Sequence, residues 1–412
     1  MPALTRRDFS TLAVVAGAAA GRLSAAGIRN TASIDDTLRG GIERRKIPAV
    51  TAMVATSDAI LYQGAFGKRD ASPGVPVKLD SIFAIASMTK AVTSTAALQL
   101  VDQGKVKLDE PASRHLPELK SLQVFEGVDS AGKPILRPAR KPVTLRHLLT
   151  HTSGFCYDTW SQEMQDWIKA GGAPPMGVAP NVPLIFEPGT RWQYGYGLDW
   201  SGKLVENVSG LTLEQYFQKN ICEPLGMKDT SFVPKPENLE RTVSRYDYRP
   251  DGSFKEQPRD FPPVAYNGGG GLNSTVGDYI KFTQMILRNG RGADGKQILR
   301  PGTVKQMSSN QIGNLGAGKL KTMNPGRSSE VNIHPGAIDK WGLGFLINTT
   351  AYQGGRAAGS LAWAGIWNTF YWIDPKSGIS AVIMMQFLPF VHTEAVGMLG
   401  DFEKAVYAQM SS

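Results

Sequence analysis

The stretch Ser87-Met88-Thr89-Lys90 suggests a reaction by itself, because it places a serine and a lysine at the start of a helix. The following run, from Ala91 to Val101, is rich in alanine and leucine and predicts a buried helix. Ser87 should therefore lie near unpaired backbone N–H groups and the positive end of the helix dipole. That environment favours a negatively charged oxygen at or beside the serine.

Lys90 falls on the same helix face as Ser87, three residues along, so the two side chains can share a hydrogen bond. A lysine held among apolar neighbours loses solvation, which favours the neutral amine and allows it to act as a base. The same four residues also describe a serine cap followed by a solvated lysine. Other segments of the chain must therefore decide between a nucleophile and a cap.

Four further stretches decide in favour of the nucleophile by their order and spacing: Leu145-Arg146-His147-Leu148-Leu149-Thr150-His151-Thr152-Ser153-Gly154, Pro188-Gly189-Thr190-Arg191-Trp192-Gln193-Tyr194, Glu223-Pro224-Leu225-Gly226-Met227-Lys228-Asp229-Thr230 and Gly268-Gly269-Gly270-Gly271-Leu272-Asn273-Ser274-Thr275. With them, the chain resembles the serine β-lactamase and penicillin-binding-protein superfamily over nearly its whole length after the first 26 residues. It is most similar to the class C-like branch that includes the family VIII carboxylesterases. The resemblance implies an α/β fold of the α+β type, with helices flanking an antiparallel sheet and a mainly α-helical domain inserted.

The resemblance also implies a catalytic tyrosine, since the family pairs its S-x-x-K motif with a Y-x-N tripeptide. Tyr194-Gly195-Tyr196 stands in that place, with Tyr194 matching and Tyr196 replacing the asparagine. Tyr194, as a phenolate or as a phenol bonded to Lys90, is expected to pass protons between nucleophile, leaving group and water. Tyr196 is expected to contact substrate, although it lacks the amide that binds the side chain of β-lactams in the family.

Trp363-Ala364-Gly365 occupies the position of the family's K-T-G triad. Gly365 should let its strand approach the substrate closely, and the N–H of Ile366 should form an oxyanion hole with that of Ser87. In penicillin-recognising relatives, the lysine of the triad attracts the substrate carboxylate and helps to lower the pKa of the tyrosine. An indole at Trp363 is expected to do neither and to present a flat apolar wall, which favours neutral acyl groups.

The order of the predicted elements suggests a discontinuous domain. A helix starting near Ser33 and two strands, 49–56 and 59–66, precede the catalytic helix, which Gly104 should close. Strands at 341–348, 360–365, 368–374 and 379–387 and a final helix at 393–409 complete an antiparallel sheet. The predicted division is an α/β domain over 27–104 and 281–412, with an inserted helical domain over 105–280. The glycine and lysine spacing in 127–133 indicates a turn, because Pro134 replaces the Ser or Thr of a phosphate-binding loop.

The first 26 residues have the layout of a signal peptide. Arg6-Arg7 precedes a short apolar run over 12–20, and small residues follow up to Ala26. The run is too short to span a bilayer, so no stable membrane anchor is expected. The sequence predicts export by the twin-arginine route to the periplasm or the medium, with cleavage near Ala26.

Composition excludes several other classes of protein. The 412 residues are 42% hydrophobic and carry a formal charge of +9 without a basic stripe interleaved with aromatics, so nucleic acid is not an expected partner. The chain has no G-x-S-x-G motif, and the pair His147 and His151 lacks a third metal ligand nearby. Cys156 and Cys222 could form one bridge or remain two buried thiols.

Together these patterns predict an exported serine esterase that needs no cofactor and acts on a small-molecule ester of short acyl chain. Ser87 attacks the ester carbonyl, Lys90 accepts the serine proton, Tyr194 relays it, and the N–H groups of Ser87 and Ile366 bind the oxyanion. The alternative is hydrolysis of β-lactams or D-amino-acid peptides by the same residues. A third hypothesis is a receptor without catalytic activity on the same fold, which would need none of Ser87, Lys90 and Tyr194.

Overall fold

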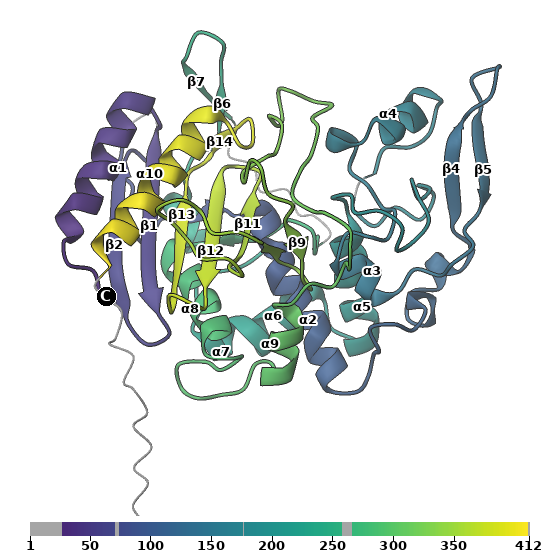
Figure 1. Cartoon of the computed structure of the whole chain (residues 1–412), viewed down its shortest axis with the longest axis horizontal. Coiled ribbons are helices and arrows are strands. Elements are labelled where there is room, and N and C mark those ends of the chain that lie inside the picture. The colour runs from purple at the N-terminus through teal and green to yellow at the C-terminus, as the bar shows by residue number, and fades with distance from the viewer. Residues whose placement is uncertain (1–26, 71–73, 176, 258–265, 411–412) are drawn as a thin grey trace, which may run out of the picture.

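A seven-stranded antiparallel sheet forms the central layer of the protein, in the order β2-β1-β13-β12-β11-β10-β9 (Figure 1). The structure is a computed structural model and describes residues 27–70, 74–175, 177–257 and 266–410. The first and last parts of the chain meet near the β2 edge of the sheet, where Thr51 of β1 pairs with Met384 of β13. The strands of this sheet are β1 (Ala49–Thr56), β2 (Ile60–Gly67), β9 (Lys340–Trp341), β10 (Leu346–Ile347), β11 (Leu361–Gly365), β12 (Thr369–Asp374) and β13 (Ile379–Met384).

The burial of these strands follows their residue patterns. β12 and β13 are buried at every position and consist mostly of β-branched, aromatic and other apolar residues, as strands covered on both faces require. β2 alternates between buried and more exposed positions along most of its length, which suits its place at the edge of the sheet. The predicted hairpin of 49–56 and 59–66 is confirmed within one residue.

Helices cover both faces of the sheet (Figure 1). The terminal helices α1 (Thr31–Arg45) and α10 (Thr393–Gln409) pack against each other on one face, and α8 (Val276–Leu287) packs against β1 and β13 on the other. The final helix has the bounds expected from the sequence. Helix α2 (Thr89–Asp102) is buried at every position from Thr89 to Leu100 and packs against α5 (Gly197–Ser209) and α6 (Leu213–Phe217).

The remaining elements belong mainly to the helical part of the chain. The β4–β5 hairpin contains the turn around 129–133, so the predicted turn is confirmed there. The helices are α3 (Leu145–Leu149), α4 (Gln162–Lys169), α7 (Glu223–Leu225) and α9 (Pro301–Met307), and the strands are β3 (Phe83–Ala84), β4 (Gln123–Val128), β5 (Pro134–Pro138), β6 (Tyr246–Tyr248), β7 (Phe254–Glu256), β8 (Asn273–Ser274) and β14 (Phe387–Leu388).

Two expectations about organisation were wrong. The predicted domain boundary at residue 280 falls inside α8, which packs on the sheet and so belongs with the α/β part. No break is visible there along the chain, because the apolar pattern of α8 is continuous. The expected strand over 341–348 is two short strands, β9 and β10, because the chain turns between them through Gly344, whose φ is 101°.

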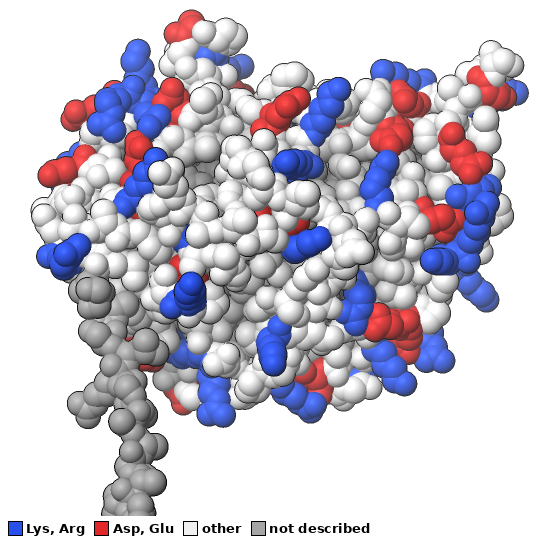
Figure 2. Space-filling view, in the orientation of Figure 1, with Lys and Arg blue, Asp and Glu red and all other residues white. Residues whose placement is uncertain are grey.

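Several sequence predictions concern the surface and the N-terminal segment. Figure 2 shows acidic and basic side chains interspersed over the visible face, without a basic stripe. The predicted signal peptide, residues 1–26, lies outside the described residues and stays a prediction. Within 27–410, apart from the three internal gaps, no helix is both long and apolar enough to cross a membrane. Cys156 and Cys222 are free and buried, so the reading as two separate thiols is confirmed.

Candidate active site

Ser87 lies in a single 3₁₀ turn, Ala86–Met88, that leads directly into α2. Ala86, just before it, adopts a left-handed φ of 43°, which a residue with a Cβ rarely does. The turn is held from several sides: the Tyr279 hydroxyl donates to the Met88 carbonyl at 2.9 Å, and the N–H of Leu272 donates to Thr89 Oγ1 at 3.1 Å. Segments far apart in the sequence thus fix the position of the serine.

Lys90 is fully buried and reaches three oxygen atoms. Its Nζ lies 3.1 Å from Ser87 Oγ, 3.2 Å from Tyr157 Oη and 2.5 Å from the carbonyl oxygen of Gly269. An ammonium group can donate to all three. A neutral amine can donate to Gly269 and Tyr157 while it offers its lone pair to the Ser87 hydroxyl, which is the arrangement a base requires.

Tyr157 was not identified from the sequence, although its hydroxyl contacts Lys90 directly. It also donates to Asp199 Oδ2 at 3.5 Å, and burial raises its pKa well above the ordinary value, as do the nearby Asp199 and Tyr194. Tyr157 therefore stays a phenol that accepts from Lys90 and donates to Asp199. No motif singles it out, since it simply follows the stretch 145–154.

Tyr194 lies beside Lys90 but presents its ring, with Nζ 4.8 Å from the ring centroid. The expected hydrogen bond between Lys90 and Tyr194 is absent from the described structure, and Tyr157 occupies that place instead. The Tyr194 hydroxyl accepts a hydrogen bond of 3.1 Å from Trp363 Nε1. The Trp363 indole thus contacts Tyr194 directly, because the two rings pack at 4.9 Å and bring the N–H to the hydroxyl.

Aromatic rings enclose Tyr194 and Trp363. Trp160 lies 5.4 Å from Tyr194, His151 lies 4.6 Å from it, and Trp341 lies 4.7 Å from Trp363, measured between ring centroids. Burial holds the pKa of His151 well below its ordinary value, with a further contribution from the charge of Lys90, so this imidazole is neutral. Its Nδ1 accepts from the N–H of Gly195 at 3.3 Å, which ties the imidazole to the backbone beside Tyr194.

Gly365 ends β11 next to the serine turn. A Cβ at this position would overlap the carbonyl oxygen of Ile85 and Oγ1 of Thr369, so only glycine allows the strand to approach so closely. In the described part of the chain, no hydrogen bond is formed by the backbone N–H of Ser87 or of Ile366. Both donors are therefore free for an oxyanion, as the sequence predicts.

Tyr196 does not fit its expected role in substrate binding. The side chain is fully buried, its ring packs 5.1 Å from that of Phe155, and its hydroxyl has no hydrogen-bond partner among the described residues. A side chain without exposed surface cannot meet a substrate in this conformation, so the residue belongs to the core at the start of α5.

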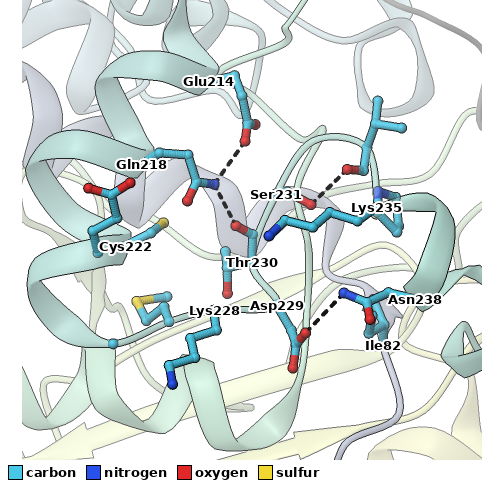
Figure 3. Close-up of a pocket in the computed structure, with 15 residues that line it drawn as sticks. Ile82, Glu214, Gln218, Cys222, Lys228, Asp229, Thr230, Ser231, Lys235 and Asn238 are labelled. Atoms are coloured by element: carbon cyan, nitrogen blue, oxygen red, sulfur yellow. Dashed lines mark hydrogen bonds between the residues drawn. The ribbon is translucent and has the colours of Figure 1, made fainter.

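A separate cavity of about 530 Å³ lies beside α6 and α7 and is lined by none of these residues. Its polar groups bind one another: Gln218 Nε2 donates at 2.8 Å to both Glu214 Oε1 and the carbonyl oxygen of Thr230 (Figure 3). Asn238 likewise donates to Asp229 at 3.3 Å (Figure 3). The chemistry of Ser87 and Lys90 therefore marks the candidate active site, and this cavity does not.

Comparison with known proteins agrees with this geometry. The family model described as Beta-lactamase matches residues 34–397. The chain is 32% identical to monacolin J acid methylbutanoyltransferase of Aspergillus terreus (strain NIH 2624 / FGSC A1156), over 91% of this chain and 95% of that protein. It is also 32% identical to lovastatin esterase of Penicillium rubens (strain ATCC 28089 / DSM 1075 / NRRL 1951 / Wisconsin 54-1255), over 86% and 92%.

The fold agrees as well. A solved structure of the LovD6 mutant of simvastatin synthase from Aspergillus terreus superposes with a TM-score of 0.79 at 32% identity, covering 91% of this chain and 94% of the other. The predicted fold class, helices around an antiparallel sheet, is confirmed. The chain belongs to the beta-lactamase family, within the superfamily of serine hydrolases and acyltransferases that share this fold.

Proposed function

We propose that this protein cleaves neutral carboxylic esters of short acyl chain through an acyl-enzyme on Ser87. The observation that carries the proposal is the placement of Lys90 Nζ 3.1 Å from Ser87 Oγ, with its two other partners fixed. A receptor without catalytic activity would not need a buried lysine aligned on a strained serine turn.

The proposed reaction conserves every proton. Ser87 Oγ bonds to the ester carbonyl carbon while its proton passes to Lys90 Nζ, and the carbonyl oxygen becomes an oxyanion that the N–H groups of Ser87 and Ile366 bind. The intermediate then loses the alcohol, which takes up the proton that Lys90 accepted. Tyr194, whose ring centroid lies 4.8 Å from Lys90 Nζ, is proposed to pass this proton on once substrate brings its hydroxyl and the amine into contact. Water then attacks the acyl carbonyl carbon and gives up a proton to the same residues. That proton returns to Ser87 Oγ as the carboxylic acid is released.

The surroundings of Trp363 support neutral acyl groups as substrates. Its indole is 5% exposed, and its only N–H is already donated to Tyr194. A substrate carboxylate docked there would find no free donor on the indole, whereas an acyl chain would meet apolar rings. Hydrolysis of β-lactams or D-amino-acid peptides by the same residues remains the alternative function.

A second candidate activity is transfer of the acyl group to an alcohol other than water. It is favoured by the likeness to a protein named as a methylbutanoyltransferase, at 32% identity over 91% of this chain. The chemistry is the same up to the acyl-enzyme, after which an alcohol replaces water as the nucleophile. The ratio of transfer to hydrolysis then depends on which acceptor reaches the ester carbonyl.

The test is a panel of chromogenic acyl esters of increasing chain length beside a chromogenic cephalosporin, with and without a competing alcohol. Wild type, Ser87→Ala and Ser94→Ala are compared. Ser94 is the control, because it is a buried serine on α2, the helix that Ser87 precedes, and its hydroxyl has no hydrogen-bond partner in the described structure. We expect ester turnover in wild type and Ser94→Ala only, and acyl transfer as new ester in the samples with alcohol. Preference for the cephalosporin would support the alternative, and turnover of no substrate would support the receptor.

A further inference from the structure

Asp199 is a buried carboxylate next to the candidate active site that the proposed reaction does not use. It lies on α5 and is 3% exposed. Its Oδ1 accepts the N–H of Gly269 at 3.0 Å, and its Oδ2 accepts the Tyr157 hydroxyl at 3.5 Å. Both partners also bind Lys90, Gly269 through its carbonyl oxygen and Tyr157 through its hydroxyl. Two chains of hydrogen bonds, one through Tyr157 and one through Gly269, therefore connect the Asp199 carboxylate to the Lys90 amine.

The packing around Gly269 preserves this connection. A Cβ at Gly269 would overlap the carboxylate of Asp199, so a glycine is needed for the N–H to reach it. Asn267, two residues earlier in the same loop, also accepts a hydrogen bond from the Gly269 N–H, through its Oδ1 at 2.9 Å. The loop thus presents its N–H to Asp199 and its carbonyl oxygen to Lys90.

We propose that Asp199 is a positioning residue that holds Lys90 through Tyr157 and Gly269 and compensates the positive charge that Lys90 gains from Ser87. The inference rests on the proposed function, in which Lys90 is the base. One O–H bond of Ser87 breaks and one N–H bond of Lys90 forms, while Asp199 neither gains nor loses a proton. A negative charge one hydroxyl away stabilises this ammonium group in a site from which water is excluded.

The charge state of Asp199 fits this role. Burial raises its pKa to about 6, against the opposing effects of Lys90, the Gly269 N–H and Tyr157. The carboxylate is therefore ionised at neutral pH and protonated in mild acid. The charged groups on the helices packed against α5 have partners of their own: Arg146 of α3 pairs with Asp109, and Glu214 of α6 accepts from Gln218. Burial raises the pKa of Tyr196, which lies beside Asp199, well above the ordinary value.

The decisive variant is Asp199→Asn, measured as kcat/KM against pH with the preferred chromogenic ester. We expect the plateau to fall by roughly 10- to 100-fold, because the base loses its counter-charge. We also expect the acidic limb, the part of the profile in which kcat/KM falls as the pH falls, to move to lower pH by about one unit or more. The reason is that the neutral amine of Lys90 is favoured once the Asp199 carboxylate is gone. A merely structural role would lower the active fraction and leave the limb in place.

Asp278→Asn is the matched control. Asp278 is also a buried carboxylate whose pKa burial raises, but it lies on α8 and binds the N–H of Asp229 at 2.7 Å. Its replacement should change stability and leave the acidic limb unmoved. Movement of the limb in both variants would overturn the assignment to Asp199.

Tyr157→Phe keeps the proposal testable even if Asp199→Asn does not fold. It removes the hydroxyl between Lys90 and Asp199 but keeps the ring, so we expect a loss of roughly 10-fold in kcat and a smaller shift of the acidic limb in the same direction. Tyr216→Phe, which alters another buried tyrosine on α6, should do neither. Wild-type kcat and limb in Tyr157→Phe, or in folded Asp199→Asn, would refute the inference. If Lys90→Ala itself retained activity, the proposed function would fail instead.

Discussion

Two buried cations in this protein are held in different ways. Arg356, between β10 and β11, is 4% exposed and binds Glu403 of α10 directly, through Nε at 2.9 Å and Nη2 at 2.6 Å. Burial alone would lower the pKa of Arg356, but Glu403 raises it above the ordinary value. Lys90 is 0% exposed and, among the described residues, forms no direct ion pair, since its nearest carboxylate lies beyond the Tyr157 hydroxyl.

The different partners of the two buried cations suit two different roles. The guanidinium of Arg356 keeps its charge permanently, and a bidentate carboxylate satisfies it, which fixes α10 against the sheet. The amine of Lys90 must change charge during a reaction, and a direct carboxylate would hold it as an ammonium group. Among the described residues, Lys90 forms direct hydrogen bonds only with uncharged oxygens. Variants at both cations test the contrast between them.

Removing the nucleophile should have the largest effect. Ser87→Ala should lower ester hydrolysis by at least ~10³-fold, because it removes covalent catalysis and leaves binding and the oxyanion donors. The melting temperature should stay close to that of wild type, as should the activity of Ser94→Ala. Retention of most activity in purified Ser87→Ala, or stoichiometric fluorophosphonate labelling of another serine, would contradict the assignment.

Breaking the structural pair should affect stability and not the reaction. Glu403→Gln should destabilise the fold by about 3–5 kcal/mol, because it leaves the Arg356 charge buried without its partner. Urea unfolding measures this loss, and kcat of the remaining folded protein should be unchanged. Glu394→Gln on the same helix is the control: its ion pair with Arg45 is partly exposed, so it should cost at most about 1 kcal/mol.

The same pair predicts a pH dependence of stability. Burial opposes ionisation of Glu403, but Arg356 lowers its pKa below the ordinary value of a glutamate. The contribution is therefore present above the pKa of unfolded glutamate, about 4.3, and is lost as the pH falls through the folded value. Unfolding free energies measured between neutral and acidic pH should show this loss in wild type and less of it in Glu403→Gln.

The reaction should need Lys90 as a proton acceptor and not only as a positive charge. Lys90→Arg should be nearly as damaging as Lys90→Ala, with losses of roughly 10²- to 10³-fold, since a guanidinium does not give up a proton near neutral pH. If Lys90 and Tyr194 form one proton-transfer unit, the double variant Lys90→Ala/Tyr194→Phe should be little worse than the poorer single variant. Losses that multiply would show that the two roles are separate.

Trp363 should have the smallest effect, on substrate preference. A substrate carboxylate facing an indole forgoes a charge-assisted hydrogen bond, a deficit on the order of 1.5–3 kcal/mol or roughly 10- to 100-fold in kcat/KM. Trp363→Lys should therefore narrow the gap between neutral esters and anionic cephalosporins. Values of kcat/KM for both substrates in both proteins measure this. A wild-type preference for the cephalosporin, or no relative change, would contradict it.

Much of the fold could be predicted from the sequence because its signals are local. Apolar runs and turn residues located β1, β2 and α10 within a residue or two, and the spacing of Ser87 and Lys90 on one helix face brought their side chains together. The close approach at Gly365 and the two oxyanion donors were instead expected from the resemblance to the family's K-T-G triad. The domain boundary predicted at residue 280 lies inside α8, because no residue pattern along the chain distinguishes the end of the inserted part from the start of the next helix.

The contact between Ser87 and Lys90 could be predicted from the sequence alone, since helical periodicity fixes the relation of the two side chains whatever the rest of the chain does. Which other hydroxyl meets Lys90 depends on tertiary packing, because Tyr157, Asp199 and Gly269 come from three separate segments. The same holds for Trp363, whose indole N–H reaches Tyr194 across the interface between β11 and the helical part. Contacts between distant segments depend on packing angles and ring orientations, and no spacing along the chain encodes these.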